Sequence, residues 1–360
     1  MVQRPEPDGS EQDATPPSPQ RRDLLKIGAA VAGGLAAGAG GATALARGPG
    51  RPLPHNPVTS GAMPLRNLGR TGYQVGVFSL GGQAAIEQPR NEAVAVPIIE
   101  RALDLGVNYV DTAARYGGDE RWSQRYVGQV MKRRRGEAFL ASKTHDRTRD
   151  GSLRLLGDSL KLLQTDHLDL WQVHNLSQME QVEQIFRPDG AVKALQEARE
   201  QGLVRHVGIT GHADPAVLME ALRRFPFDTL LLALNAADPH HLSFKARLLP
   251  LAVEQELGII GMKIPARGRL LSSWTPPPAG DSSRRAQDRG PGALSMREAL
   301  RYVLSLPVST VIVGCDSIAQ LEENVALARG FNPLNADQMA ELERRAQPIH
   351  EQALFFRNWA

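Results

Sequence analysis

Four polar side chains with complementary chemistry follow three successive apolar runs of the chain, near the point where each run ends. Asp111 and Tyr116 follow the second run, Lys143 ends the third and His174 ends the fourth. A lysine beside an aspartate tolerates an apolar setting because the two charges compensate, and a nearby cation lowers the pKa of a phenol. Tyr116 is therefore a candidate general acid toward a developing alkoxide, and His174 a candidate donor that orients a substrate carbonyl.

Each of these four residues also has a structural interpretation when it is taken alone. A single aspartate or lysine at a strand end is commonly a solvated residue of the rim. His174 alone could equally be a hydrogen-bonded histidine of the core. The combination favours function, because Asp111, Lys143 and His174 come from three consecutive strands and would meet at one edge of a sheet, with Tyr116 on the loop just above. We therefore take Asp111, Tyr116, Lys143 and His174 as the candidate catalytic residues.

Short apolar runs alternate with helical stretches from Met63 onward, and these elements must position the four residues. The runs are rich in Val, Ile and Leu and are bounded by Gly, Pro, Asp or Asn, as buried strands are. Strands that are apolar throughout are covered on both faces, which indicates a parallel sheet inside helices. Eight strand–helix repeats predict an α/β fold, a single-domain (β/α)8 TIM barrel. The predicted strands are 75–82, 107–113, 138–143, 168–175, 204–211, 229–235, 258–264 and 308–314.

An open dinucleotide-binding sheet is the alternative fold, and the first predicted strand argues against it. Such a sheet would carry G-x-G-x-x-G after this strand, where the chain has Gly81-Gly82-Gln83. Residues 271–292, after the seventh strand, contain many Gly and Pro residues and break the alternation of strands and helices. A loop of this length is usually functional or disordered, and its place predicts a lid over the barrel mouth.

The four candidate residues and the sequences around them resemble the aldo-keto reductase family. The strings NYVDTAARYGGDE, FLASK, DHLDLWQVHN and VIVGCDSIAQLEENV carry the resemblance, in this order, and it covers Met63 to about Arg329. The resemblance implies that Asp111, Tyr116, Lys143 and His174 form a catalytic tetrad. It also implies an NAD(P)H-dependent oxidoreductase that reduces a small aldehyde or ketone, with Tyr116 as the acid.

The family resemblance further implies a nicotinamide dinucleotide that extends across the barrel mouth, with its adenosine end at the segment after the eighth strand. There the chain enters a helix, whose free N–H groups suit a phosphate. Gln320, Glu323 and Asn324 match the potassium-channel β-subunit branch of the family. The residues expected to contact the cofactor are Gly82, Asn175, Thr210, Asn235, Lys263, Gly314, Ser317, Gln320, Glu323 and Asn324.

Several of these positions depart from the family pattern. Thr210-Gly211-His212 stands where many relatives carry Ser-Asn, and Lys263 aligns with the tyrosine that stacks on the nicotinamide. Gly314 and Gln320 align with the lysine and arginine that hold the 2′-phosphate of NADP(H). We therefore expect NADP(H) to be favoured by a small margin, with NAD(H) also possible. Arginines after the seventh strand, Arg267, Arg269, Arg284 and Arg285, could supply the missing charge or could only solubilise the loop.

The first 46 residues have the pattern of an export signal. Arg21-Arg22 and Lys26 precede a weakly apolar run from residue 27 to 46, which ends in Ala44-Leu45-Ala46. This order resembles a twin-arginine signal with cleavage after Ala46. A retained membrane anchor is the alternative, although the run holds few of the large apolar residues that insert stably.

The domain organisation follows from these assignments. We expect a twin-arginine signal peptide at 1–46, a Pro-rich linker at 47–62, a barrel at 63–335 and a C-terminal helical extension at 336–360. The signal predicts the twin-arginine translocase as a partner and the periplasm or cell envelope as the location. Because that location lacks a regular supply of free NAD(P)H, we expect the cofactor to leave the cytoplasm already bound. The redox partner that would renew it, the substrate and the oligomeric state stay open.

Composition narrows the remaining functions. The 360 residues are 42% hydrophobic and 22% charged, and a net charge of +3 is too balanced to indicate a nucleic-acid partner. One cysteine excludes a disulfide scaffold and any cysteine-based metal cluster, and no metal site is expected. A metal-dependent barrel hydrolase using His145, His174, His212 and Asp111 is one alternative, but Leu80-Gly81-Gly82 occupies the place of its usual H-x-H. A non-catalytic nucleotide sensor is the other, and the intact tetrad argues against it.

Overall fold

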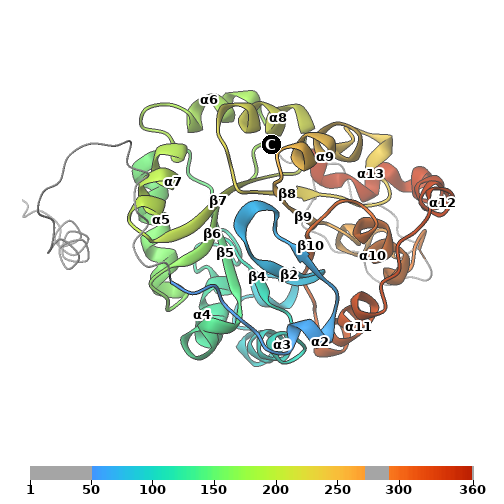
Figure 1. Cartoon of the computed structure of the whole chain (residues 1–360), viewed down its shortest axis with the longest axis horizontal. Coiled ribbons are helices and arrows are strands. Elements are labelled where there is room, and N and C mark those ends of the chain that lie inside the picture. Colours follow the sequence, from blue (N-terminus) through green and yellow to red (C-terminus); the bar gives the residue numbers. More distant parts are fainter. Residues whose placement is uncertain (1–50, 272–291, 359–360) are drawn as a thin grey trace, which may run out of the picture. The chain divides into compact units, whose positions relative to one another are not determined.

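Eight parallel strands close into a barrel in the order β10-β3-β4-β5-β6-β7-β8-β9 (Figure 1). The computed structural model describes residues 51–271 and 292–358. Neighbouring strands run in parallel register, with Leu80 beside Val110 and Lys143 beside Gln172. The predicted (β/α)8 barrel is therefore confirmed. The strands are β3 Phe78–Gly81, β4 Tyr109–Asp111, β5 Phe139–Thr144, β6 Leu168–Val173, β7 Val204–Gly211, β8 Thr229–Ala233, β9 Gly258–Met262 and β10 Thr310–Val313.

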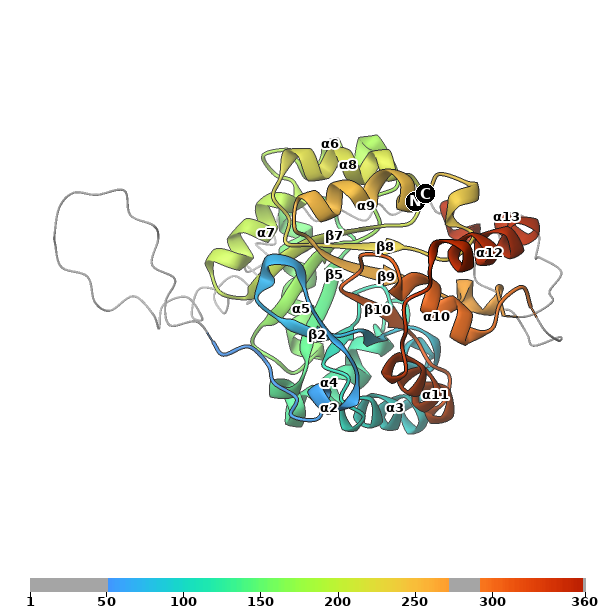
Figure 2. The ribbon, with the colours of Figure 1, turned by 45° about the vertical axis from the view of Figure 1, so that its right-hand side comes forward.

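Helices surround the barrel (Figures 1 and 2), and their apolar side chains are buried. Local signals in the sequence explain where several of them begin. Asp214 caps α8 ahead of Pro215 at its first position, and Ser295 forms a capping box with Glu298 at the start of α10. The barrel helices are α3 Glu92–Asp104, α4 Trp122–Arg134, α5 Arg149–Leu162, α6 Met179–Ile185, α7 Ala191–Glu200, α8 Pro215–Arg224, α9 Phe244–Glu254, α10 Met296–Leu304 and α11 Ile318–Arg329.

A short antiparallel hairpin covers the N-terminal end of the barrel, an element that the sequence did not predict. Its strands are β1 Leu65–Asn67 and β2 Gln74–Gly76. Between them, the Arg70 guanidinium donates to the carbonyls of Phe227 and Gln255, which precede β8 and β9. The predicted first strand at 75–82 is thus divided between the hairpin and β3. The hairpin, blue in Figure 1, lies across the ring of strands and leaves the opposite end for the active site.

The segment before the hairpin contacts the barrel, although a linker was expected there. The guanidinium of Arg205 donates to the carbonyl of Arg51, and the buried amide of Asn56 donates to the carbonyl of Leu103 at 2.8 Å. A one-turn helix, α2 Thr59–Ala62, follows. Residues 51–62 therefore form part of the surface that packs on the barrel, and only residues 47–50 of the expected linker lie outside the described part.

Helices also follow the barrel at the C-terminus, where an extension was expected. They are α12 Ala336–Ala346 and α13 His350–Ala353, with a final 3-10 turn at Phe355–Asn358. In this last turn, Phe356 and Arg357 are buried. The predicted signal peptide at 1–46 and most of the predicted lid at 271–292 lie outside the described residues. Within the described ranges, no helix is both long enough and apolar enough to cross a membrane.

Candidate active site

The four candidate catalytic residues meet inside the mouth of the barrel. Lys143 on β5 donates a hydrogen bond to Asp111 at the end of β4 at 2.5 Å, and a second to the carbonyl of Thr112 at 2.9 Å. The Lys143 ammonium also lies over the ring of Tyr116, 4.9 Å from its centre. The rings of Tyr116 and His174 meet edge to face, with their centres 5.7 Å apart. The structure thus brings together all four residues.

Burial dominates the electrostatics of this cluster. Asp111 is 0% exposed and Lys143 is 1% exposed. Removal from water raises the pKa of Asp111 and lowers the pKa of Lys143, and the ion pair between them opposes both shifts. Neither group keeps its charge without the other, so the pair acts as one unit.

The pKa of Tyr116 moves in the opposite direction to the sequence-based argument, which had Lys143 lowering it. Burial raises the pKa of the phenol well above its usual value, and the nearby carboxylates of Asp111 and Glu87 add to the shift. Desolvation of the phenolate therefore outweighs the opposing attraction of Arg267. Tyr116 stays protonated at neutral pH, which is the form that an acid needs.

His174 is held in its neutral form. Burial lowers its pKa well below the usual value, and the charges of Lys143 and Arg147 lower it further. Its Nδ1 atom is buried and has no hydrogen-bond partner among the described residues. Arg147 fixes the backbone here by donating to the carbonyls of His174 and Asn175, both at 2.8 Å. The sequence analysis missed Arg147, because bonds to backbone carbonyls leave no pattern in the sequence.

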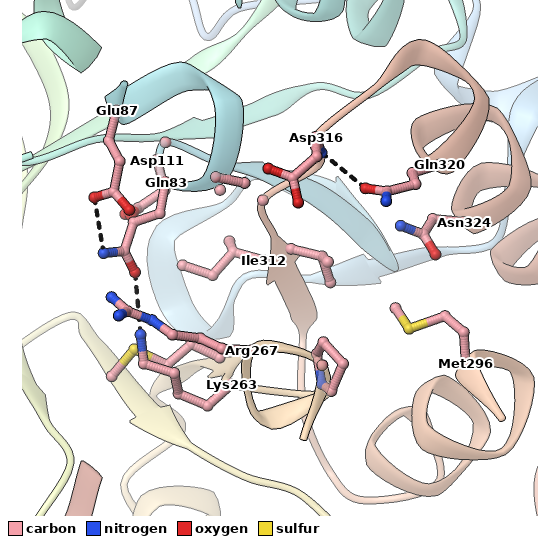
Figure 3. A pocket seen from close by; sticks show the side chains of 18 of the residues that line it. Gln83, Glu87, Asp111, Lys263, Arg267, Met296, Ile312, Asp316, Gln320 and Asn324 are labelled. Carbon is pink, nitrogen blue, oxygen red and sulfur yellow. Dashed lines mark hydrogen bonds between the residues drawn. The ribbon is translucent and has the colours of Figure 1, made fainter. Parts of the chain in front are cut away.

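A groove of about 450 Å³ runs from the tetrad across the barrel mouth to α11 (Figure 3). Tyr116 and Asp111 line its inner end. Gly82 lines the groove beside them, and it must be glycine because a Cβ there would lie 2.4 Å from the carbonyl oxygen of Asp111. The groove is long and open, which suits an extended ligand. Of the expected cofactor residues, it is lined by Gly82, Lys263, Gly314, Gln320, Glu323 and Asn324.

Lys263 is joined to the opposite wall of the groove. Its ammonium donates to Gln83 Oε1 at 3.0 Å, and the Gln83 amide donates in turn to Glu87 at 3.1 Å (Figure 3). Burial lowers the pKa of Lys263 to about 7, with Arg267 adding to the effect. Gln83 and Glu87 were not predicted as site residues, although Gln83 directly follows the glycine pair of the first strand. This contact places a titrating cation beside the tetrad.

The residues expected at the carboxamide end form a hydrogen-bonded set beside His174. Asn175 donates its backbone N–H to Thr210 Oγ1, and its side-chain oxygen pairs with His212 Nδ1, both at 2.8 Å. Thr210 thus holds the backbone, and the Asn175 amide nitrogen remains for a ligand. Asn235 is different, because its amide bonds Lys263 O, Ala353 O and Ala237 N within the protein. Its side chain supports the loops, and it does not line the groove.

The outer end of the groove is built on the first turn of α11. Ser317 caps the helix by accepting from the backbone N–H of Gln320, and Gln320 Oε1 accepts from the N–H of Asp316 at 2.8 Å (Figure 3). The Asn324 amide contacts the sulfur of the buried Cys315 at 3.5 Å. Ser317 therefore shapes the helix start and does not line the groove.

The remaining sequence candidates lie in different places. Arg267 lines the groove, whereas Arg269 is buried over the ring of Phe355, and Arg284 and Arg285 lie outside the described residues. Outside the predicted set, His240 on the 3-10 turn after β8 forms a hydrogen bond with the carbonyl of Glu343 on α12. Among the residues that the structure describes, no three His, Cys, Asp or Glu side chains are grouped so that they could hold a metal ion.

The model of the aldo/keto reductase family matches residues 74–346, which is most of the chain and all eight barrel strands. The chain belongs to the aldo/keto reductase family. The family and its oxidoreductase members make it an NAD(P)H-dependent oxidoreductase that reduces carbonyl compounds. The family resemblance seen in the sequence is thereby confirmed.

Curated relatives and solved structures agree with this assignment. The chain is 27% identical over 315 residues to the uncharacterized oxidoreductase YqkF of Bacillus subtilis (strain 168), covering 79% of this chain and 95% of that protein. It is 29% identical over 309 residues to L-galactose dehydrogenase of Arabidopsis thaliana, with the same coverage. The holo form of aldo-keto reductase AKR11C1 from Bacillus halodurans superposes with a TM-score of 0.63 at 25% identity, covering 79% of this chain and 96% of that one.

The groove of this reductase has the donor set that a nicotinamide dinucleotide requires. Lys263 and Arg267 line its middle and offer positive charge to a pyrophosphate. The helix start at α11 offers backbone N–H groups to an anion. Asn175 follows His174 and does not itself line the groove, and its amide nitrogen can donate to a carboxamide oxygen. The residues present therefore fit the cofactor of the family.

Proposed function

We propose that Tyr116 is the general acid of the reductase and that His174 orients the substrate carbonyl. Lys143 and Asp111 form an ion pair beside Tyr116, in which the two opposite charges compensate each other. The observation that carries the proposal is the convergence of these four side chains inside the barrel mouth, where Asp111 and Tyr116 line the inner end of the groove. The bound nicotinamide supplies a hydride to the carbonyl carbon. The protein's own part is to place the oxygen atom and to give it a proton.

The protonation states support these roles. The raised pKa of Tyr116 keeps a proton on the phenol until an alkoxide, which is a much stronger base, forms beside it. The lowered pKa of His174 leaves a neutral imidazole, which still carries one N–H to donate to the carbonyl oxygen. The experiment that tests the assignment measures nucleotide binding by fluorescence quenching and then carbonyl reduction over a panel of aldehydes and ketones. Nucleotide binding without any reduction would contradict it.

For the cofactor, we propose NADP(H) over NAD(H) by a small margin. The family resemblance favours NADP(H), and Gln320 matches the branch that binds it. The margin is small because the described lining at the outer end of the groove offers amides and the carboxylates of Asp316 and Glu323, with no cation for a 2′-phosphate. Dissociation constants for NADPH and NADH test this directly, and tighter binding of NADH would overturn it.

We also propose that the enzyme is exported to the periplasm or cell envelope by the twin-arginine translocase, with its nucleotide already bound. The support is the sequence pattern of residues 1–46, with Arg21-Arg22 ahead of a weakly apolar run. Replacement of Arg21 and Arg22 by lysine should keep the protein in the cytoplasm of fractionated cells. Unchanged export would contradict the route, and a wild-type protein purified without nucleotide would contradict loading before export.

A further inference from the structure

Two arginines that form no ion pair with a described residue lie in the loops after β4 and β5, beside the tetrad. The groove is lined mainly from β3, β9 and β10, and β5 stands opposite β9 in the strand order. Arg115 directly precedes Tyr116 in the loop after β4, and Arg147 follows β5. Neither guanidinium forms an ion pair with any residue in the described ranges, 51–271 and 292–358.

Arg147 is anchored beside the substrate-orienting histidine. Its hydrogen bonds go to the carbonyls of His174 and Asn175 and, at 3.4 Å, to Gln181 Oε1. These three acceptors are neutral, and the charge of the adjacent Asp146 acts on Arg147 without an ion pair between the two side chains. Arg115, by contrast, is exposed and makes no hydrogen bond with the described residues, so its guanidinium is available to a ligand.

The charges of these arginines affect the pKa values of two histidines, His145 and His174. Burial lowers the pKa of His145, and Arg115 is the next cause; Arg115 also adds to burial in lowering the pKa of His174. His145 Nδ1 is buried and has no partner in the described structure. The hydrogen bond of Arg147 to the His174 carbonyl and the adjacency of Arg115 to Tyr116 in the chain bring both arginines beside the tetrad, and these electrostatic effects agree with that placement.

The nearby carboxylates are engaged elsewhere. Asp146 accepts from the N–H and the hydroxyl of Thr148 at the start of α5, at 2.8 and 2.7 Å. Glu120 pairs with Arg125, and Glu87 lies on the groove side, where it bonds Gln83. The loops after β4 and β5 therefore carry a surplus of positive charge around His145, where Arg115, Arg121 and Arg147 outnumber Asp146, and such a surplus attracts and concentrates anions.

We propose that the substrate is an aldehyde or ketone that also bears a carboxylate, and that Arg115 binds this carboxylate while Arg147 adds charge behind it. The inference rests on the proposed function, in which Tyr116 and His174 hold the carbonyl. An arginine is suited to a carboxylate because its planar fork donates two parallel hydrogen bonds. A carboxylate held by Arg115 fixes the part of the substrate that does not react, and this positions the carbonyl for reduction.

The test compares two substrates that differ in charge and hardly in shape, 3-carboxybenzaldehyde and its neutral amide, 3-formylbenzamide. We expect the wild-type enzyme to prefer the acid in kcat/KM by about tenfold or more, the effect of one charge-assisted hydrogen bond. Added salt should narrow the ratio, because Arg115 is exposed. In Arg115→Gln the ratio should fall to near one, and Arg115→Lys should restore part of it.

A matched control is Arg125→Gln, which removes one positive charge from α4, where Arg125 pairs with Glu120 outside the mouth. This control should keep the wild-type ratio. Calorimetric binding of the two compounds to the nucleotide-loaded enzyme provides a second readout that needs no turnover. Equal binding of acid and amide, or an equal loss of both in Arg115→Gln, would overturn the proposal. Failure to reduce either compound, with the acid still bound through Arg115, would instead count against the assigned chemistry of Tyr116.

Discussion

The ammonium group of Lys143 lies over the ring of Tyr116, while its two hydrogen bonds go to Asp111 and to the carbonyl of Thr112. Lys143 therefore places a positive charge beside the phenol of Tyr116, while its own hydrogen bonds go to other groups. Because the phenol is buried, its pKa is raised, and Tyr116 donates its proton only when a strong base appears. This arrangement protects the acid form at neutral pH.

Replacement of Tyr116 by phenylalanine removes the proposed acid and leaves the ring in place. We expect kcat to fall by about 10²- to 10⁴-fold, the usual contribution of a positioned acid. Nucleotide binding should persist, because the groove is otherwise unchanged. Steady-state reduction of a reactive aldehyde and fluorescence quenching by NADPH measure the two effects. Near-normal turnover in this variant would remove Tyr116 from its role.

Replacement of Lys143 by methionine should impair reduction about as strongly, for a different reason. The buried Asp111 then loses the ion-pair partner that it has in the described structure, and an uncompensated buried charge costs about 3–5 kcal/mol of stability. The double variant Asp111→Asn/Lys143→Met should recover most of this stability in urea unfolding but not the activity. Asp111→Asn alone should reduce kcat less than Lys143→Met does. Recovery of activity in the double variant would show that Lys143 acts only structurally.

The sequence was sufficient to predict the barrel and the meeting of the tetrad. Apolar runs such as Leu168–Val173 are strands that are buried at every position, and parallel strands end at one edge, so Asp111, Lys143 and His174 had to converge. The hairpin β1–β2 was not predicted because each strand is only three residues long and β1 has no buried position.

The electrostatics could not be predicted from the sequence in the same way. The order of the strands predicts that Lys143 and Tyr116 are close. The direction in which the pKa of the phenol shifts, however, depends on how completely the phenol is removed from water. The contact of Lys263 with Gln83 likewise joins residues 180 positions apart, on loops whose shapes leave no periodic signal. Asn235 was expected at the cofactor for its polarity alone, and the structure uses its amide between loops.

The pH dependence of nucleotide binding should report Lys263. With a pKa of about 7, this lysine is charged below neutral pH and neutral above it. The phosphates of a dinucleotide favour its charged form, so the dissociation constant should increase as the pH is raised from about 6 to about 9. Arg267, Glu87, Lys143 and Asp111 set the charge around Lys263 in the groove.

Two substitutions at Lys263 make the pH test specific. Lys263→Met should bind nucleotide weakly at every pH, with little pH dependence. Lys263→Arg should bind tightly over the whole range, because an arginine keeps its charge. A pH profile of Lys263→Met that matches the wild type would assign the dependence to another group.

The buried pair of Arg357 and Asp238 ties the C-terminus to the active site. The two side chains are 1% and 0% exposed and lie 2.5 Å apart, and Arg357 also donates to the carbonyl of His212 at 2.6 Å. His212 in turn pairs with Asn175, which is the expected contact of the nicotinamide carboxamide. Replacement of Arg357 by methionine should therefore lower the free energy of unfolding by about 3 kcal/mol, because Asp238 is left as a buried charge.

The same replacement should also weaken nucleotide binding, and the double variant Arg357→Met/Asp238→Asn separates the two effects. It removes the stranded charge, so urea unfolding should return toward the wild-type midpoint. The bond to His212 stays lost, so the dissociation constant for NADPH should stay raised. If stability and nucleotide affinity recover together, the C-terminal turn only supports the fold. If affinity stays low in a stable protein, the turn positions Asn175 through His212.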